Sequence, residues 1–320
     1  MLAYLSSLNP LALLRAAPGG IAQGLIWGIM ALGVYITFKM LDFADLSVDG
    51  SFATGGAVTI MLILNGWNPE LALVIAILSG IVAGIVTGLL HTKLGIPAIL
   101  AGILTQISLY SINLNIMGKA NQAINVNAIT LRITSNTNYM LRTILIMLAA
   151  CAVIITLLYF YLGTEHGSAL RATGINQQMA RAQGINTRSM TIVGLGLSNG
   201  LVALAGGILA QYQGFADVNM GRGAIVIGLA AVIIGEVIGT AIFKKSRNFV
   251  IRLSFVVIGG IIYYLVYVFV LWLKFPADDM KLLTAIVVAI FLAIPYLQNT
   301  AKTSFRRSAK RNAKKAKEGK

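Results

Sequence analysis

Three aspartates lie at the polar head of an apolar segment, in Lys39-Met-Leu-Asp-Phe-Ala-Asp-Leu-Ser-Val-Asp-Gly-Ser-Phe-Ala-Thr-Gly-Gly56. Asp45 and Asp49 are four residues apart, so a helix would place both carboxylates on one face. Charged side chains at membrane depth cost free energy, and they usually line a cavity or meet a helix end. Two interpretations follow. The carboxylates line or gate a solute pathway with Ser47 and Ser51, or they cap the free N–H groups of a half-helix.

Further polar residues occur in Ser108-Leu-Tyr-Ser-Ile-Asn-Leu-Asn115, at the end of an apolar segment that opens with Gly95-Ile-Pro97. Tyr110 and Asn113 are candidates for the same pathway. The alternative is that these side chains only form hydrogen bonds between helices. The polar interruption within residues 39–56 predicts a discontinuous helix there, because irregular backbone at membrane depth is tolerated only inside protein or beside a cavity.

A second candidate site is the loop Gly167-Ser-Ala-Leu-Arg-Ala-Thr-Gly-Ile-Asn-Gln-Gln-Met-Ala-Arg-Ala-Gln-Gly-Ile-Asn186. Asn176 is a good helix N-cap and Gly184 a good helix stop, and Gly167 and Gly174 bracket a shorter turn between them. Two short helices of this kind are typical of a docking surface for a soluble partner, whereas an ordinary solvated loop is the alternative. The residues expected to form the surface are Gly167, Leu170, Arg171, Gly174, Asn176, Met179, Ala180, Arg181 and Gly184.

The elements that position these residues are membrane-spanning helices. Hydrophobic residues make up 58% of the 320 residues and charged residues 11%, whereas a soluble domain has about 25% charged residues. The chain is therefore predicted to be an all-α integral membrane protein with about nine spans, eight to ten being compatible with the pattern. The spans are predicted at Gly20–Phe38, Phe43–Leu64, Leu71–Thr92, Ala98–Met117, Thr143–Leu162, Thr191–Tyr212, Ala224–Phe243, Phe249–Leu273 and Leu282–Tyr296.

The placement of Lys and Arg predicts the orientation. Residues 301–320 form a strongly basic tail, which we expect in the cytoplasm beside anionic lipid rather than on nucleic acid. Residues 1–300 would then form a single permease domain. Counting back through nine spans places the loop of residues 167–186 in the cytoplasm and the N-terminus outside. The polar loop of residues 118–142 would face outward, where it could contact a substrate-delivering protein.

The sequence lacks the motifs that are typical of several functional classes. The chain has no Gly-x4-Gly-Lys-Ser/Thr phosphate loop, no nucleophile–base constellation, and no Cys/His cluster with metal-ligand spacing. The single cysteine, Cys151, has no disulfide partner in the chain. We therefore expect neither an enzyme nor a metal protein.

Two motifs carry a resemblance to a known family. Residues 167–186, followed by Leu204-Ala-Gly-Gly-Ile-Leu-Ala210, resemble the coupling region of the type II ABC-importer permeases for branched-chain amino acids and ribose-type sugars. Asp45-Leu-Ser-Val-Asp-Gly-Ser51 resembles an element of the sugar members, with Asp49 as an extra residue. The resemblance extends from about Gly20 to Tyr296, and it is nearest to an amino-acid uptake branch, aromatic amino acids such as tryptophan included.

The resemblance implies a set of partners in a bacterial plasma membrane. These are a second permease copy, a pair of cytoplasmic ATP-binding subunits and an extracellular substrate-binding protein or lipoprotein. ATP and magnesium would belong to the ATPase, and this chain would hold no cofactor. Residues 167–184 would transmit closure of the ATPase to the membrane helices. The chain departs from the sugar permeases by lacking their first span and by its aspartates, which argues against a neutral sugar as cargo.

One alternative from a different class stays open at the level of sequence. Asp45, Asp49 or Glu236 could take up a proton in an ion-coupled secondary carrier. For Glu236 the competing interpretation is a structural hydrogen bond or an ion pair with Lys244 or Lys245. A sugar-importer permease is a further alternative within the same family.

Overall fold

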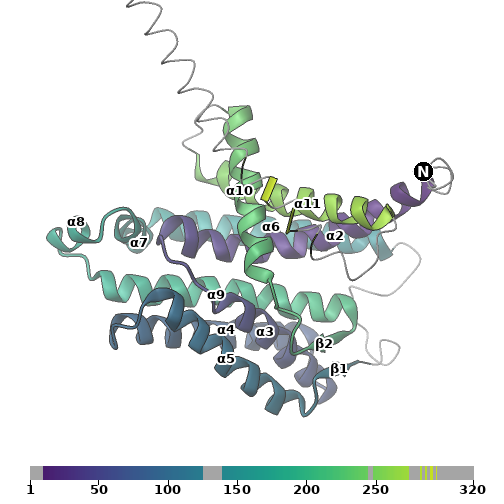
Figure 1. Ribbon diagram of the computed structural model, residues 1–320, viewed down its shortest axis with the longest axis horizontal. Helices are drawn as coiled ribbons and strands as arrows, with labels where there is room; N and C mark the ends of the chain where they lie inside the picture. Colours follow the sequence, from purple (N-terminus) through teal and green to yellow (C-terminus); the bar gives the residue numbers. More distant parts are fainter. Residues whose placement is uncertain are drawn as a thin grey trace, which may run out of the picture.

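The computed structural model describes residues 10–124, 139–243 and 248–273, and single positions between 282 and 293. Nearly all of these residues are helical (Figure 1). The elements in chain order are α2 (Pro10–Tyr35), the π-helix η1 (Ile36–Met40), α3 (Val48–Leu64), α4 (Pro69–Thr92), α5 (Ala98–Met117), β1 (Asn121–Ala123), α6 (Tyr139–Gly163), α7 (Glu165–Ile175), α8 (Gln177–Ala182), α9 (Thr187–Gln213), β2 (Phe215–Asp217), α10 (Ala224–Phe243) and α11 (Phe249–Trp272).

The described residues contain six helices that are long and apolar enough to cross a membrane, at Leu11–Met40, Pro69–Thr92, Ala98–Met117, Leu141–Gly163, Thr187–Gln213 and Phe249–Trp272. Two shorter apolar helices, Val48–Leu64 and Ala224–Thr240, accompany them. The predicted all-helical membrane architecture is confirmed, whereas the count of nine spans is not. The ninth predicted span falls largely outside the described residues, and so does the basic tail of residues 301–320.

Asparagine caps explain where several helices begin. Asn68, Asn176, Asn186 and Asn248 each accept a backbone N–H from the first turn of the helix that follows, which satisfies one of its free donors. At α4 the cap is followed directly by Pro69, a residue suited to the first helical position. The predicted cap at Asn176 is therefore confirmed, and Gly184 follows α8 with a φ of +80°, as expected for a helix stop.

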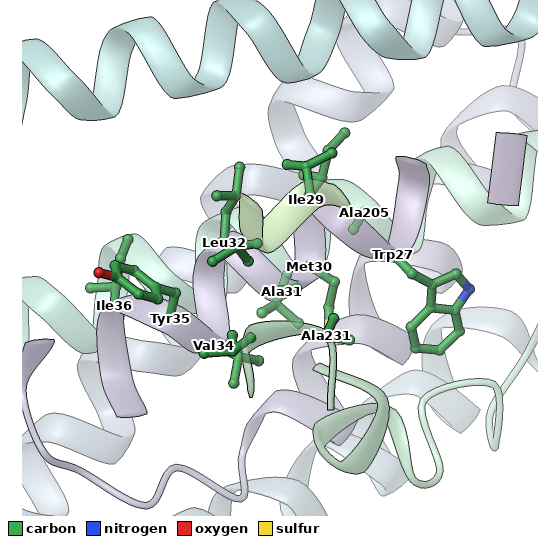
Figure 2. Close-up of a cluster of buried hydrophobic side chains, with 14 of the residues drawn as sticks. Trp27, Ile29, Met30, Ala31, Leu32, Val34, Tyr35, Ile36, Ala205 and Ala231 are labelled. Atoms are coloured by element: carbon green, nitrogen blue, oxygen red, sulfur yellow. The ribbon is translucent and has the colours of Figure 1, made fainter. Parts of the chain in front are cut away.

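The hydrophobic core is built along α2. Figure 2 shows its side chains gathered with Ala205 of α9 and Ala231 of α10. Trp27 stacks on Phe52 of α3 with ring centroids 4.8 Å apart, and its centroid lies 5.8 Å from that of Tyr264 in α11. An apolar helix buried on all sides packs at the centre of a bundle. Helix α2 is therefore the element around which α6, α9, α10 and α11 are arranged.

Helix α9 packs closely on its neighbours through glycines. It contacts α2 as well as α3 and α4 (Figure 1). A Cβ added at Gly80 or Gly84 of α4 would collide with the carbonyl oxygens of Asn199 and Leu195, respectively. In α3, a Cβ at Gly55 would collide with the carbonyl of Ala203. Glycines at these positions let helix backbones approach each other directly, as is common in membrane bundles.

The polypeptide leaves the helical conformation between η1 and α3. Residues 41–47, here called the break segment, form bends and turns, and Asp42 has a φ of +52°. Figure 1 shows that α3 then runs back toward the end of the bundle where α2 began. The interruption predicted near residues 39–56 is present. It joins two helices that run in opposite directions.

The two ends of the bundle differ in structure (Figure 1). At one end β1 pairs antiparallel with β2, with Asn121 opposite Asp217 and Ala123 opposite Phe215. The N-terminal end of α2 lies on the same side. At the other end lie α7 and α8, together with the turn between α4 and α5. The polar stretch after α5 therefore contributes a short strand to one end, while the proposed docking helices occupy the opposite end.

The contact between α4 and α9 makes a direct prediction. Gly84→Ala should lower the free energy of unfolding by about 1–3 kcal/mol, because the methyl group would collide with a backbone carbonyl that cannot move alone. Gly196→Ala is the matched control on α9, since its Cβ would lie 3.5 Å from Ile85 in ordinary contact. Thermal unfolding in mild detergent measures both. Equal melting temperatures for the two variants would contradict the packing described here.

Candidate functional site

The break segment is held in place by a buried carboxylate. Asp45 is only 2% exposed, and its Oδ1 accepts hydrogen bonds from the backbone N–H and the hydroxyl of Ser47. Its Oδ2 accepts from Nδ2 of Asn199 in α9 at 2.8 Å. The Ser47 hydroxyl also lies 3.2 Å from Oδ1 of Asn199, and the Asn199 amide donates to the Leu195 carbonyl. The three side chains, here called the Asp45 cluster, are therefore mutually hydrogen-bonded.

The position of Asn199 places the Asp45 cluster at mid-depth. Asn199 is near the centre of α9, a helix of 27 residues. A rise of 1.5 Å per residue puts it about 18 Å from the start of a helix about 40 Å long. A carboxylate at that depth needs hydrogen-bond donors from the protein itself, because lipid supplies none. Ser47 and Asn199 supply them.

Three other helices close around the break segment. A Cβ at Gly174 of α7 would collide with the carbonyl of Met40, and a Cβ at Gly102 of α5 would lie 2.7 Å from the backbone nitrogen of Leu46. The rings of His91 in α4 and of Phe43 are nearly perpendicular, with centroids 5.1 Å apart. With Asn199 of α9, the segment therefore touches α4, α5, α7 and α9.

Asp49, the other predicted pathway carboxylate, caps a second helix. Its Oδ2 accepts from the backbone N–H of Gly223 and its Oδ1 from that of Ile225, both at 2.9 Å. Gly223 directly precedes α10 and Ile225 lies in its first turn, where free N–H groups and the helix dipole favour an anion. The capping interpretation is thus realised at Asp49, although the capped helix is α10 and not the helix that carries Asp49.

A cavity of about 290 Å³ lies beside this cap. It is lined by Asp49, Gly50 and Ala53 of α3, by Gln106, Ile107, Tyr110 and Asn113 of α5, and by Val218, Asn219 and Arg222 from the loop before α10. The cavity thus unites three predicted pathway residues, Asp49, Tyr110 and Asn113. It also combines a carboxylate, a guanidinium group and a phenol ring.

Two buried polar side chains between α3 and α5 are not hydrogen-bonded within the described residues. Asn113 is 0% exposed, and neither its amide nitrogen nor its amide oxygen has a partner. The hydroxyl of Ser51 is buried and equally unpaired. Burying such groups costs about 1–3 kcal/mol each. Asn113 lines the cavity, whereas Ser51, Ser47 and Asp45 do not line it.

Two residues that were expected to contact a partner instead attach the predicted docking helices to the bundle. Leu170 and Ala180 are both 0% exposed, so the expectation that their side chains contact a partner is wrong. Leu170 and Ala180 lie on the sides of α7 and α8 that pack on the bundle. Gly167 and Gly174 do not bracket a turn either. Both lie inside α7, at points where it meets the backbone of α6 and of Met40.

The exposed residues of the docking helices include Asn176, Met179, Arg181 and Gly184 of the predicted set, and also Ile175, which was not predicted. Ile175 is 82% exposed and Met179 is 50% exposed, at the junction of α7 and α8. Arg171 lies over the ring of Phe249 in α11 at 5.8 Å and donates to Ser168. Arg181 donates from Nε to the hydroxyl of Thr187. The two arginines therefore fix the short helices through hydrogen bonds to nearby side chains and, for Arg171, through the ring of Phe249.

Glu236 pairs with a residue that the sequence did not indicate. Its carboxylate lies 2.9 Å from Nζ of Lys39 in η1, and both side chains are about half exposed. The expected partners, Lys244 and Lys245, lie outside the described residues. Within the described part of the chain, no group of three or more His, Cys, Asp or Glu could hold a metal ion.

Sequence reasoning missed Asn199, Gln106, Asn219 and Arg222. Asn199 carried a usable signal, because a polar side chain in the middle of a long apolar helix is unusual and commonly functional. Arg222, between Gly221 and Gly223, had no signal of its own. Its place beside Asp49 depends on the loop from β2 folding back onto α3.

Comparison with known proteins defines the class. Residues 17–294 match the family described as branched-chain amino acid transport system / permease component. The chain is 42% identical over 294 residues to a tyrosine transport system permease protein of Clostridioides difficile, covering 92% of this chain and 96% of that protein. It is 32% identical over 273 residues to an uncharacterized protein of Rickettsia prowazekii, covering 85% and 94%. An autoinducer 2 import system permease protein of Yersinia enterocolitica is 31% identical over 215 residues, covering 65% and 58%.

The chain therefore belongs to the branched-chain amino acid transport system / permease component family. It is a multi-pass membrane protein and the permease component of an ABC-type transport system, so it is a transporter subunit and not an enzyme. The resemblance found in the sequence is confirmed. The matched range contains the Asp45 cluster, the cavity and α7 with α8.

Replacing one carboxylate oxygen of Asp49 by an amide nitrogen tests whether this side chain caps α10. Asp49→Asn should lower the free energy of unfolding by about 1–2 kcal/mol, because an amide NH₂ would replace one of the two oxygens that accept backbone N–H groups. Asp42→Asn is the control, since Asp42 is exposed and asparagine also tolerates its positive φ. Thermal unfolding in detergent is the measurement. A fully stable Asp49→Asn protein would show that the cap contributes nothing.

Proposed function

We propose that this chain is the permease of an ATP-driven importer, and that it moves an aromatic amino acid delivered by an extracellular binding protein. The observation that supports this proposal most is the surface of α7 and α8, where Ile175 is 82% exposed while Leu170 and Ala180 are buried. A large apolar side chain exposed at the end of a bundle, on helices fixed from the inside, is typical of a protein–protein contact. The partner in this proposal is a pair of cytoplasmic ATPase subunits, which hold the ATP and magnesium.

The partners of the acidic side chains favour ATP over an ion gradient as the source of energy. Asp45 accepts bonds from Ser47 and Asn199, and Asp49 accepts two backbone N–H groups. Glu236 pairs with Lys39. A proton relay needs a carboxylate that can change its protonation state without dismantling the fold. These three carboxylates have structural hydrogen bonds or ion pairs instead, which argues against the ion-coupled carrier.

The chemistry of the cavity supports an amino acid as cargo. Arg222 can bind a carboxylate, the Asp49 side an ammonium group, and Tyr110 an aromatic ring. A neutral sugar offers no ionised group to this pair of opposite charges. The relative from Clostridioides difficile, named as a tyrosine transport permease, supports the same choice. Tyr110 and Asn113 would contact the solute on its passage, whereas Asp45, Ser47 and Ser51 would shape the wall behind them.

The open side of the cavity supports a second permease copy. Leu100, Leu104, Ile107, Tyr110 and Leu114 form an exposed stripe along α5, at helical spacing. Tyr110 and Ile107 of this stripe also line the cavity. A two-fold interface along the stripe would bring two cavities together at the axis and enclose a single pathway.

The proposed orientation follows from the same assignments. Helices α7 and α8 would face the cytoplasm, and the β1–β2 end, with the N-terminal end of α2, would face outward. The binding protein would then dock near β1 and β2, and the C-terminal tail would be cytoplasmic. The host membrane in this proposal is a bacterial plasma membrane.

Purification of the tagged chain from its native membrane, followed by native mass spectrometry, tests the proposal. Two permease copies should carry two ATPase subunits. Ile175→Asp and Met179→Asp should each lose the ATPase, since a central apolar contact contributes about 2 kcal/mol or more to binding. Trp67→Asp, at an exposed apolar position at the other end of the bundle, should retain it.

The contrary outcomes are distinct. An ATPase that stays bound to both docking-helix variants would show that α7 and α8 are not its contact. A wild-type chain that purifies without any ATPase would contradict the importer itself.

A further inference from the structure

One short stretch of chain packs against the docking helix α7 at its beginning and leads to the cavity at its end. This stretch is the break segment, and its two ends contact different elements. Its beginning packs against α7, whereas Asp45 and Ser47 near its end bind α9. Two residues further on, Asp49 caps α10 at the wall of the cavity. Neither the family assignment nor the proposed function gives this segment a role in coupling.

The contact between α7 and the break segment is backbone against backbone. A Cβ at Gly174 would collide with the Met40 carbonyl and lie 2.8 Å from the Cα of Leu41. At Gly194 of α9, a Cβ would contact the ends of both Leu41 and Leu170. Closely packed backbone cannot absorb a displacement in the way a flexible side chain does. A movement of α7 therefore pushes directly on Met40 and Leu41.

The remainder of the segment is non-helical and would absorb such a push by changing its dihedral angles, unless it is held elsewhere. Asn199 provides the hold, because its amide binds Asp45 while its own helix packs on α4 through Gly80. A segment pushed at one end and fixed near its other end turns about the fixed point. The part beyond the fixed point is Asp49 with the N-terminus of α10.

We propose that Asn199 is a positioning residue for transport, which makes the Asp45 cluster the pivot that passes movement of α7 to the cavity. The inference rests on the proposed ATP-driven function. Without the pairing of Asp45 and Asn199, α7 would still bind its ATPase, but its movement would end in the break segment. The cavity would then no longer respond to nucleotide.

The experiment measures that response without needing a solute. A reporter cysteine replaces Asn219, an exposed cavity residue in the loop before α10 and outside the α5 stripe, in a Cys151→Ala background. The rate of its reaction with a maleimide is followed in the permease–ATPase complex, with and without Mg-ATP and vanadate. In the parent complex the nucleotide should change the rate about fivefold or more, the lower end of ordinary coupling between sites.

The variants exchange the two partners of the buried hydrogen bond. Asn199→Asp places two carboxylates face to face and should abolish the nucleotide response. The double variant Asp45→Asn/Asn199→Asp restores one acid and one amide, and it should recover the response. Ser198→Ala is the matched control, because the neighbouring Ser198 bonds the Gly33 carbonyl of α2 and not the break segment. If Asn199→Asp fails to assemble, Ser47→Ala removes a single hydroxyl of the cluster and should weaken the response.

Co-purified ATPase and melting temperature are recorded for every variant, so a loss of assembly is visible as such. A full response in assembled Asn199→Asp, or in Ser47→Ala when that variant is needed, would overturn the proposal. A double variant that assembles without recovering the response would overturn it too. A parent complex that binds ATPase but shows no response would refute the pivot alone, whereas a parent chain without ATPase would refute the proposed function and the pivot together.

Discussion

The architecture depends on how one interruption of the helices is satisfied inside the membrane. Between η1 and α3 the backbone is irregular, and lipid offers no hydrogen bonds to such a segment. The protein supplies them from Ser47 and from Asn199, near the centre of α9, to the buried carboxylate of Asp45. This requirement places α9 against the break, and the close glycine contacts of α9 with α3 and α4 then position the rest of the bundle.

The same arrangement separates rigid from adaptable parts. Backbone contacts through glycine connect α3, α4 and α9, and a core along α2 connects α3 with α10 and α11. Helix α5 packs on α3 at Gly50, bonds α4 through the buried pair Thr105 and Thr87, and approaches the break segment at Gly102. Its Asn113 is buried without a partner in the described structure. Among the six membrane-length helices of the described residues, the least buried one therefore lines the cavity, as a moving wall requires.

The sequence predicted local features better than it predicted contacts between residues that are distant along the chain. Asn176 and Gly184 acted as helix signals because a cap depends only on neighbouring residues. The polar interruption was visible for the same reason. The pairing of Asp45 with Asn199 joins residues 154 positions apart, and no local pattern indicates it. Leu170 and Ala180 were expected to face a partner because a short amphipathic helix does not reveal which side its apolar stripe meets. Gly174 was taken for a turn residue, whereas tertiary packing explains it.

The most direct test of this account is uptake by purified protein in sealed vesicles, with L-tyrosine as the probe. The permease is reconstituted with its ATPase and binding protein, and separately alone. The account predicts uptake only for the complete assembly and only with ATP, with no uptake when a proton gradient is applied to the permease alone. Uptake by the permease alone under a proton gradient would contradict it, because the structural hydrogen bonds and ion pair of Asp45, Asp49 and Glu236 would then not exclude a proton relay.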